Sequence, residues 1–546
     1  MKTKILLASL VLSIGTLSAQ NYQVPVSEKN EPMMKGKFQP TWESLGNYQV
    51  PEWFRNAKFG IWAHWGPQCV EGSGDWMARS MYMEGSREYK YHVEHYGHPS
   101  EVGFKDILPL FKAEKWDPDK LVELYKKIGA QYFFAMGNHH DNMDLWDSKY
   151  QPWNSMNMGP KRDVLAEWEK AARKNGLPFG ISFHADRAWQ FYEVAQRYDR
   201  HGDKIGVPYD GTLTKADGKG KWWEGYDPQD LYAQNHPMSY GSWSNDMLGR
   251  QWDWGNGAVL PTEDYCTNFY NRTMDAINRY NPELIYFDTT VLPFYPFSDT
   301  GLKLAAHFYN HYMATHKGKL NAVVFGKKLD EAQRKSMVWD VERGAPDKIL
   351  PQPWQCCSCI GNWHYNTSFY EQDRYKSAAT IIKLLVDIVS KNGNMLLSVP
   401  MRADGTIDDK EEKILNNLAE WMSVNKEGII DTYPCNKFGE GPIADSAIPM
   451  KDQGFNESTY AQATAEEKRF TQTDKYLYVT ALAWPDDAQI SIKSLSLNND
   501  LLANKVKTIE LLGYGKVSFS QTDKELSVKL PEKPVNKIAP VLKIRK

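Results

Sequence analysis

Cysteine is scarce in this chain of 546 residues. Six cysteines occur, at positions 69, 266, 356, 357, 359 and 435. Their small number and irregular spacing exclude a disulfide-rich scaffold, which needs many paired cysteines in a short chain. Cys356, Cys357 and Cys359 form a cluster, but a zinc site of the usual kind would need a second spaced pair. A metal site at this cluster is therefore the weaker interpretation.

An excess of charge of either sign is also absent. Lysine and arginine total 65, against 68 aspartates and glutamates. This balance predicts neither a nucleic acid nor an anionic membrane surface as partner. Beyond the N-terminal segment, no apolar run approaches the ~20 residues of a membrane span. The sequence also has no internal repeat and no low-complexity tract.

The first residues have the organisation of a secretory signal peptide. Lys2 and Lys4 precede an apolar run over residues 5–17, and Leu17-Ser18-Ala19 ends it with small residues. This order predicts cleavage after Ala19, so that residues 1–19 are removed and the protein is exported to the periplasm or the extracellular space. No cysteine follows the cut, and we expect a soluble mature protein.

Aromatic residues are abundant, and short apolar runs alternate with helical patterns. The chain contains 20 Trp, 30 Tyr and 21 Phe, and aromatics in such number often line sugar sites. Strand-like runs cover residues 59–63, 132–136, 179–183, 284–287, 322–325, 336–339 and 395–399. Helical patterns cover residues 119–128, 163–175, 263–280, 301–316, 377–392 and 408–424. The alternation predicts an α/β fold with a (β/α)8-like TIM barrel over residues 20–433, with a doubly wound sheet as the alternative.

Two further segments differ from this alternation. Residues 434–546 contain short alternating runs at 476–481, 488–492, 507–512 and 526–530, separated by turn residues. They predict a C-terminal β-sandwich domain. Residues 187–261 are rich in Trp, Tyr, Gly and Asp with little periodicity, and a loop of this length is usually a lid or a binding loop.

Polar side chains follow the strand-like runs. In chain order they are His64, then His139 with His140 and Asp141, then His184 with Asp186, then Asp288, and finally Asp340 with Glu342. In a (β/α)8 barrel these positions meet at one end, where active sites lie. Metal-assisted hydrolysis could use the histidines as ligands, but no HxH or HExxH spacing is present. Glycoside hydrolysis needs two carboxyl groups and aromatic residues, and the aromatic content favours it.

Several segments resemble the glycoside hydrolase family 29 α-L-fucosidases, in collinear order over residues 40–435. They are Trp53-Phe54-Arg55-Asn56-Ala57-Lys58-Phe59-Gly60-Ile61 with His64-Trp65-Gly66, then His139-His140-Asp141 with Leu145-Trp146-Asp147-Ser148-Lys149-Tyr150, then Lys161-Arg162-Asp163-Val164, and then Lys391-Asn392-Gly393-Asn394 with Asp404-Gly405-Thr406. The resemblance implies a barrel followed by a β-sandwich, no cofactor and no obligatory metal. It also implies hydrolysis of terminal α-L-fucosyl residues from glycans, with retention of configuration through a covalent glycosyl-enzyme.

The resemblance also assigns site residues. Asp288 stands where the family has its nucleophile, and the acid/base is assigned to Glu342, with Asp340 as the alternate. The predicted sugar-binding residues are His64, Asp75, Trp76, His139, His140, His184 and Trp354, and Gly361-Asn362-Trp363 resembles another aromatic segment near the pocket. His184 stands near a position where the family has a tyrosine, and Asp75 stands where a longer acid is common. Two alternatives therefore remain open, an α-L-galactosidase with the same mechanism and a non-catalytic carbohydrate-binding protein.

Overall fold

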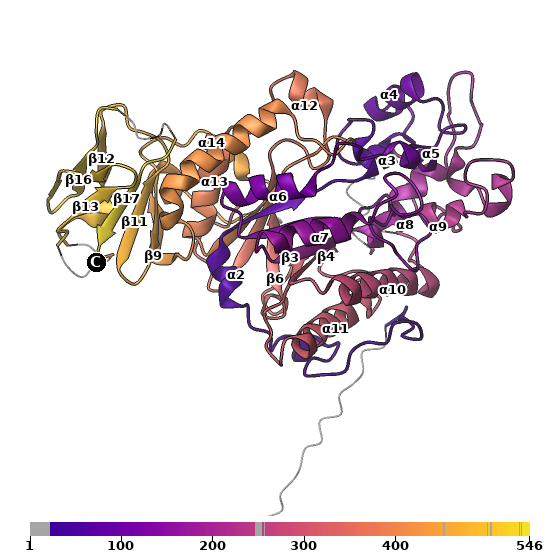
Figure 1. Ribbon diagram of the computed structural model, residues 1–546, viewed down its shortest axis with the longest axis horizontal. Helices are drawn as coiled ribbons and strands as arrows, with labels where there is room; N and C mark the ends of the chain where they lie inside the picture. Colours follow the sequence, from indigo (N-terminus) through magenta and orange to yellow (C-terminus); the bar gives the residue numbers. More distant parts are fainter. Residues whose placement is uncertain are drawn as a thin grey trace, which may run out of the picture.

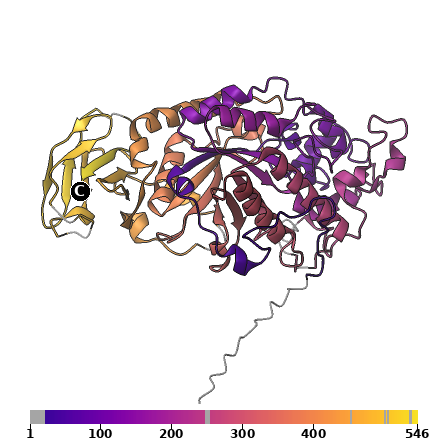
Figure 2. The ribbon, with the colours of Figure 1, turned by 60° about the horizontal axis from the view of Figure 1, so that its bottom comes forward.

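Eight parallel strands close into a barrel at the centre of the computed structural model (Figures 1 and 2). The strands are β1 Phe59–Ala63, β2 Tyr132–Asn138, β3 Phe179–Phe183, β4 Leu284–Thr290, β5 Val323–Lys327, β6 Val338–Glu342, β7 Trp354–Cys359 and β8 Gly393–Ser398. They follow one another around the barrel in chain order, and β8 pairs with β1. The closure confirms the predicted TIM barrel and excludes the doubly wound sheet.

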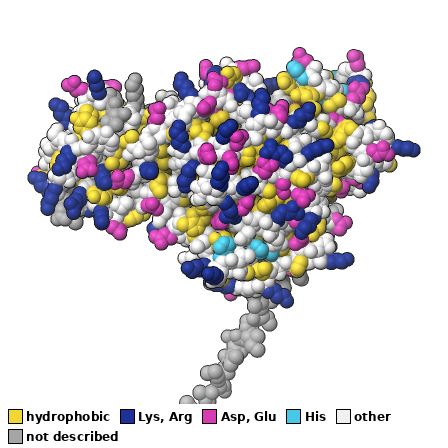
Figure 3. Space-filling view, viewed as in Figure 1, with side chains coloured by type: hydrophobic (Ala, Val, Ile, Leu, Met, Phe, Trp, Pro, Cys, Tyr) yellow, Lys and Arg dark blue, Asp and Glu magenta, His cyan; other side chains and the backbone are white. Residues whose placement is uncertain are grey.

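The structure describes residues 22–245, 254–255, 257–450, 454–498, 501–502, 505–533, 536 and 538–546. The predicted signal peptide, residues 1–19, lies outside the described residues. Within them, no helix combines the length and the apolar character needed to cross a membrane. Basic and acidic side chains are interspersed over the face seen in Figure 3, as the balanced composition predicts.

Helices cover the outside of the barrel at the positions that the sequence predicts. They are α6 Pro118–Lys127, α7 Val164–Lys174, α10 Glu263–Tyr280, α11 Thr300–Thr315, α13 Ala378–Ser390 and α14 Asp409–Asn425. Most of them begin after a residue whose side chain accepts a hydrogen bond from a backbone amide of the first turn, as Asp117 does for α6 and Asp408 for α14. Such caps satisfy amides that have no partner inside the helix.

Two barrel strands differ most from the prediction. β6 begins at Val338 and extends to Glu342, beyond the expected residues 336–339. β7 was not expected as a strand, because its sequence Trp-Gln-Cys-Cys-Ser-Cys lacks a clear apolar run. All six of its residues are nevertheless buried. Its polar side chains have internal partners, since Gln355 donates to Asp340 and Ser358 donates to Glu457, and this pairing makes burial tolerable.

The segment expected as a long loop forms part of a lateral subdomain, drawn in purple and magenta on the right of Figure 1. Its short helices are α3 Met77–Ser80, α4 Arg87–His95, α5 Phe104–Ile107, α8 Ala188–Phe191 and α9 Pro228–Tyr232. They surround a separate hydrophobic core that includes Tyr82, Phe104, Trp153, Trp223 and Tyr232. Because these helices are short and separated by turn residues, the sequence has no repeating apolar pattern that would indicate this core.

The C-terminal domain consists of two antiparallel sheets, as predicted. One sheet contains β9 Tyr433–Glu440, β10 Lys468–Gln472, β11 Tyr476–Ala481, β13 Ile509–Leu511, β14 Gly515–Lys516 and β17 Val541–Arg545, and the other contains β12 Gln489–Ile492, β15 Phe519–Gln521 and β16 Leu526–Lys529. Residues from both sheets share one hydrophobic core.

The remaining short helices are α1 Trp42–Leu45, α2 Glu52–Ala57, α12 Thr367–Glu371 and α15 Pro442–Asp445.

Helix α13 joins the two domains. It packs against β9 and β10, and the buried Asp387 contacts the Lys391 ammonium at 2.8 Å and the Arg469 guanidinium at 2.6 Å. Because two cations surround one buried carboxylate, this contact fixes the C-terminal domain against the barrel.

Candidate active site

A pocket of about 360 Å³ opens at the carboxyl end of the barrel strands. Its lining residues are Trp62, His64, Asp75, Trp76, His139, Asp288, Lys327, Glu342 and Trp363. Charged and aromatic side chains therefore surround a small opening at this end of the barrel.

Successive layers of inward-facing side chains decide which carboxylates reach the pocket. Asp340 and Glu342 are two residues apart on β6, so both face the barrel interior. Asp340 lies one layer deeper, where its carboxylate accepts hydrogen bonds from Tyr286 at 3.0 Å and from Gln355 at 2.8 Å. It is fully buried, and burial raises its pKa to about 6. Glu342, at the end of the strand, is the carboxylate of β6 that lines the pocket.

A single ammonium group bridges Asp288 and Glu342, two of the three carboxylates of the pocket. The Lys327 nitrogen lies 2.5 Å from Asp288 Oδ1 and 2.8 Å from Glu342 Oε2. These two oxygens cannot be farther apart than the two distances taken together. The carboxylates of Asp288 and Glu342 are therefore close neighbours that share one cation.

The surroundings of Asp288 keep it ionised. Burial by itself would raise the pKa of Asp288, but Lys327, followed by His184 and His140, holds this pKa well below its usual range. In turn, although burial opposes the charge of Lys327, Asp288 and Glu342 raise the pKa of its ammonium well above the usual range. A carboxylate held in this state is ready to act as a nucleophile.

Two of the predicted sugar-binding histidines contact Asp288. His184 is fully buried, with Nδ1 3.1 Å from Asp288 Oδ2 and Nε2 3.1 Å from the Ser182 hydroxyl. The Nε2 atom of His140 lies 3.7 Å from the same carboxylate oxygen, and its Nδ1 contacts the His184 carbonyl at 2.8 Å. Neither histidine is among the residues that line the pocket. Both nitrogens of His184 therefore have partners within the protein, Asp288 and Ser182.

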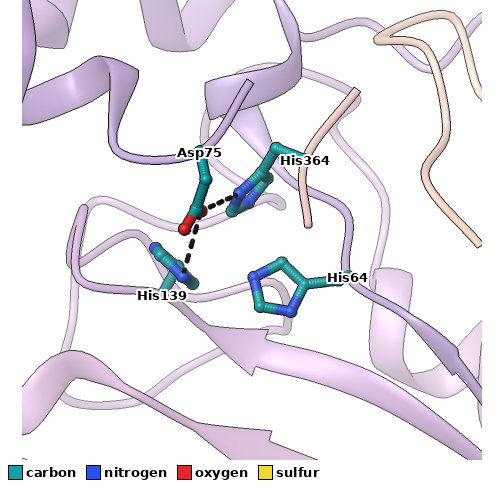
Figure 4. Close-up of side chains that lie close together, drawn as sticks. All are labelled: His64, Asp75, His139 and His364. Atoms are coloured by element: carbon teal, nitrogen blue, oxygen red, sulfur yellow. Dashed lines mark hydrogen bonds and ion pairs between the residues drawn. The ribbon is translucent and has the colours of Figure 1, made fainter. Parts of the chain in front are cut away.

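Three further lining residues, His64, Asp75 and His139, form a group with His364, and the four side chains point toward one another in Figure 4. Asp75 Oδ1 lies 2.8 Å from His364 Nδ1 and 3.9 Å from His139 Nε2. His139 Nδ1 lies 2.6 Å from the Gln68 amide. Within the described part of the chain, neither ring nitrogen of His64 has a hydrogen-bond partner. Both nitrogens of this buried imidazole are therefore available to a bound hydroxyl or to water.

The imidazoles of His64 and His139 are neutral. Burial, together with neighbouring histidines, lowers the pKa of His64 and of His139 well below the usual range. A neutral imidazole has one donor and one acceptor nitrogen, which suits a sugar hydroxyl that both gives and takes a hydrogen bond. The same four side chains also have the grouping that could hold a cation, as do His139, His140 and His184. In the second group, His184 already has partners at both nitrogens, which makes it the poorer ligand set.

The loop after β1 supplies Asp75 and Trp76. Trp76 has a left-handed backbone conformation, with φ 64°, which bulky residues rarely adopt and which surrounding structure must hold in place. Such conformations gather at binding sites. The structure thus brings both predicted residues into the pocket.

Trp354 is the predicted site residue that the structure places elsewhere. It is the first residue of β7, so it lies at the amino end of the barrel, where its indole donates to the Lys391 carbonyl. It borders a different surface depression with Trp339 and Arg334. Because the pocket lies at the carboxyl ends of the strands, a residue that begins a strand cannot reach it. Trp363, in the loop after β7, provides the aromatic wall instead.

The sequence prediction missed Lys327 and His364. Lys327 ends β5, two residues after the apolar run 322–325, so the rule that located the other site residues would also have found it. His364 lies five residues beyond the end of β7, which was not recognised as a strand. The cysteine cluster lies within β7, where all three side chains are buried and none forms a disulfide bond.

Two family models match the chain. The model described as Alpha-L-fucosidase matches residues 26–427, and the model described as Alpha-L-fucosidase C-terminal domain matches residues 462–545. Plasma α-L-fucosidase of Homo sapiens is 24% identical over 515 residues, which cover 92% of this chain and 90% of that protein. Tissue α-L-fucosidase of Bos taurus is 24% identical over 538 residues, which cover 97% of this chain and 94% of that protein.

Solved structures have the same fold. A Thermotoga maritima α-fucosidase in complex with a mechanism-based inhibitor superposes with a TM-score of 0.66 at 24% identity, covering 93% of this chain and 100% of that one. An α-L-fucosidase GH29 trapped covalent intermediate from Bacteroides thetaiotaomicron superposes with a TM-score of 0.57 at 16% identity. The match covers 94% of this chain and 98% of that one.

Proposed function

The chain belongs to the α-L-fucosidase family of glycoside hydrolases, and we propose that it is an exo-acting, retaining enzyme that removes terminal α-L-fucosyl residues from glycans. The observation that carries this proposal is the contact of Lys327 with both Asp288 and Glu342. This contact holds two carboxyl groups close together in the pocket, and a covalent glycosyl-enzyme mechanism needs such a pair as nucleophile and acid/base. The trapped covalent intermediate of the Bacteroides thetaiotaomicron relative supports the same chemistry.

In the first step, an oxygen of Asp288 attacks the anomeric carbon while the bond from that carbon to the glycosidic oxygen breaks. Glu342 gives its proton to the departing oxygen, and the sugar is left as an ester of Asp288. Lys327 and His184 favour the attack because they keep Asp288 ionised and oriented before the substrate arrives.

In the second step, Glu342 is a carboxylate and takes a proton from water. The water oxygen attacks the anomeric carbon, and Asp288 leaves as a carboxylate, so that two inversions give retention. Once Asp288 is esterified it carries no charge, and the Lys327 ammonium then neutralises Glu342 alone. When Asp288 leaves, the ammonium is again in place to stabilise its negative charge.

The pocket wall supports recognition of a deoxy sugar. The neutral imidazole of His64 can donate to one hydroxyl and accept from another. His139, whose Nδ1 faces the Gln68 amide, can offer its Nε2, and Asp75 can accept from a further hydroxyl. Trp62, Trp76 and Trp363 provide apolar surface for a sugar face and the C6 methyl group of fucose. The small volume of the pocket favours a terminal residue over an internal one.

The experiment that tests this proposal compares chromogenic aryl α-L-fucoside and α-L-galactoside and follows the anomer released by NMR. We expect hydrolysis of the fucoside at higher kcat/KM, with the α-anomer of L-fucose appearing first. Initial release of the β-anomer would contradict the retaining mechanism. Preference for the galactoside would contradict the proposed substrate, and binding of fucose without hydrolysis would contradict the enzymatic function.

We further propose that the protein is exported. The support is the N-terminal sequence, in which Lys2 and Lys4 precede the apolar run and Ala19 provides a cleavage position. Expression in a bacterial host, followed by N-terminal sequencing of the periplasmic protein, should give Gln20 as the first residue. A full-length protein confined to the cytoplasm would contradict export.

A further inference from the structure

A short segment from outside the barrel binds the backbone that carries Glu342. This segment, residues 454–457, is called the strap below. It lies in the stretch 428–461 between the two matched family ranges. Gly454 forms a parallel bridge with Glu342, and the Phe455 amide donates to the Glu342 carbonyl at 2.8 Å. The strap therefore extends the pairing of β6 at the residue that faces the pocket.

The strap also holds the residues that follow Glu342. The Glu457 amide donates to the Arg343 carbonyl at 3.0 Å. The Asn456 side chain accepts from the Ala345 amide at 2.9 Å and donates to the Ala345 carbonyl at 3.0 Å. The Asn456 side chain thus makes with Ala345 the two hydrogen bonds that a neighbouring β-strand would otherwise make. Three consecutive strap residues thus fix the backbone from Glu342 to Ala345.

Glu457 anchors the strap in the barrel. Its buried carboxylate contacts Arg343 at 2.7 Å, Lys376 at 2.8 Å and the Ser358 hydroxyl at 2.6 Å. Burial opposes ionisation, but Lys376 and Arg343 lower the pKa of Glu457 below its usual range. The carboxylate is therefore charged and connects the strap to β7 and to the residue next to Glu342.

The contact between strap and β6 leaves no space for a side chain. Gly454 has φ 142°, and a Cβ atom placed there would lie 1.9 Å from the Glu342 carbonyl oxygen. Glycine is therefore required for the strap to approach this carbonyl. Similarly, a Cβ atom on Gly344 would lie 2.3 Å from the Asn456 amide oxygen.

We propose that the strap is a positioning element for Glu342, so that proton transfer to the leaving group depends on a segment outside the catalytic barrel. This inference rests on the proposed function, in which Glu342 is the acid/base. An acid/base must serve two steps from one location, and misplacement by ~1 Å can cost about 100-fold in rate. Glu342 ends its strand, where the barrel alone gives less support, and the strap supplies the missing partners.

The test uses Asn456→Ala in the full-length protein and a series of aryl and alkyl α-L-fucosides with leaving groups of rising pKa. We expect kcat/KM to fall about 10-fold or more for the poorest leaving group and less than about 3-fold for an activated aryl fucoside, which departs without protonation. Asn456→Asp keeps the bond from the Ala345 amide but loses the donation to its carbonyl, and should give an intermediate loss on poor leaving groups.

Asn310→Ala is the matched control. The Asn310 amide pairs in the same way with both backbone groups of Phe38, at 2.9 Å and 2.8 Å, but it holds the N-terminal arm to α11. We expect any loss in this variant to be equal across the substrate series. Thermal melting and titration of active sites with a mechanism-based inhibitor correct each rate for the fraction of folded enzyme.

Two outcomes would overturn the inference. One is an equal loss across the series in Asn456→Ala, which indicates a structural role only, and the other is an unchanged series. Glu342→Ala separates this failure from failure of the proposed function. If Glu342→Ala shows the leaving-group dependence and Asn456→Ala does not, the strap proposal alone is wrong. If neither variant shows it, the acid/base assignment is wrong as well.

Discussion

Replacing Lys327 with methionine removes the cation that keeps Asp288 ionised. Methionine has a similar length but no charge, so the change tests the electrostatic contact between Lys327 and Asp288. His184 and His140 also face Asp288, but burial lowers the pKa of both imidazoles, that of His140 to about 3. They are therefore neutral at ordinary pH, and in the described part of the chain no other cation contacts this carboxylate.

The magnitude follows from the geometry. At an effective dielectric constant of about 20, two charges ~4 Å apart interact by about 4 kcal/mol, or almost three pKa units. Lys327 and Asp288 are 13% and 14% exposed, so solvent and rearrangement reduce this value, and we expect the pKa of Asp288 to rise by about 2. A nucleophile must be ionised, and its activity is lost as pH falls through its pKa. Removal of Lys327 should therefore move this loss to higher pH.

The assay is the pH dependence of kcat/KM on an activated aryl α-L-fucoside, which does not need protonation by Glu342. We expect the acidic limb for Lys327→Met to lie ~2 pH units above that of the wild type, and the limb for Lys327→Arg to stay near it. Lys303→Met is a matched control, since Lys303 is also 13% exposed and also contacts two carboxylates, those of Glu28 and Asp299. An acidic limb in Lys327→Met at the wild-type position would refute the reasoning.

Three further predictions concern Asp288, His139 and Asp387. Asp288→Ala should lose turnover by several orders of magnitude while it remains folded, and azide should restore cleavage of an aryl fucoside with release of the inverted glycosyl azide; near-normal activity without azide would disprove the nucleophile. His139→Ala should raise KM and lower kcat, and wild-type activity should survive EDTA; inactivation by EDTA with rescue by zinc would favour a metal site. Asp387→Ala should lower the free energy of unfolding by about 3 to 5 kcal/mol, since it removes the carboxylate that pairs with the buried Lys391 and leaves Arg469 with Glu467 alone. An unchanged melting temperature would contradict the role of this contact. Because Lys391 and Arg469 depress the pKa of Asp387 against the effect of its burial, stability should fall as pH drops below the ordinary range of aspartate.

Some features were accessible from the sequence because they depend on neighbouring residues. Helix α6 has its cap at Asp117, and β1 and β3 begin and end at the predicted residues. A strand or helix in a barrel repeats a short pattern of buried and exposed positions, and that pattern is written in consecutive residues. The polar residue after an apolar run then indicates the carboxyl end of a strand, which is how Asp288 and the histidines were located.

The tertiary structure decided the rest, because it depends on residues far apart in the chain. Glu342 and Asp340 are equivalent in a linear pattern, and only the stagger of neighbouring strands places Asp340 one layer below the pocket. Trp354 and Trp363 are both near β7, but closure of the barrel puts one at each end. The contact of Lys327 with both carboxylates, and that of the strap with Glu342, arise from segments 15 or more residues apart. Local periodicity fixes which elements form, whereas the chemistry of the pocket is set by which of their ends meet.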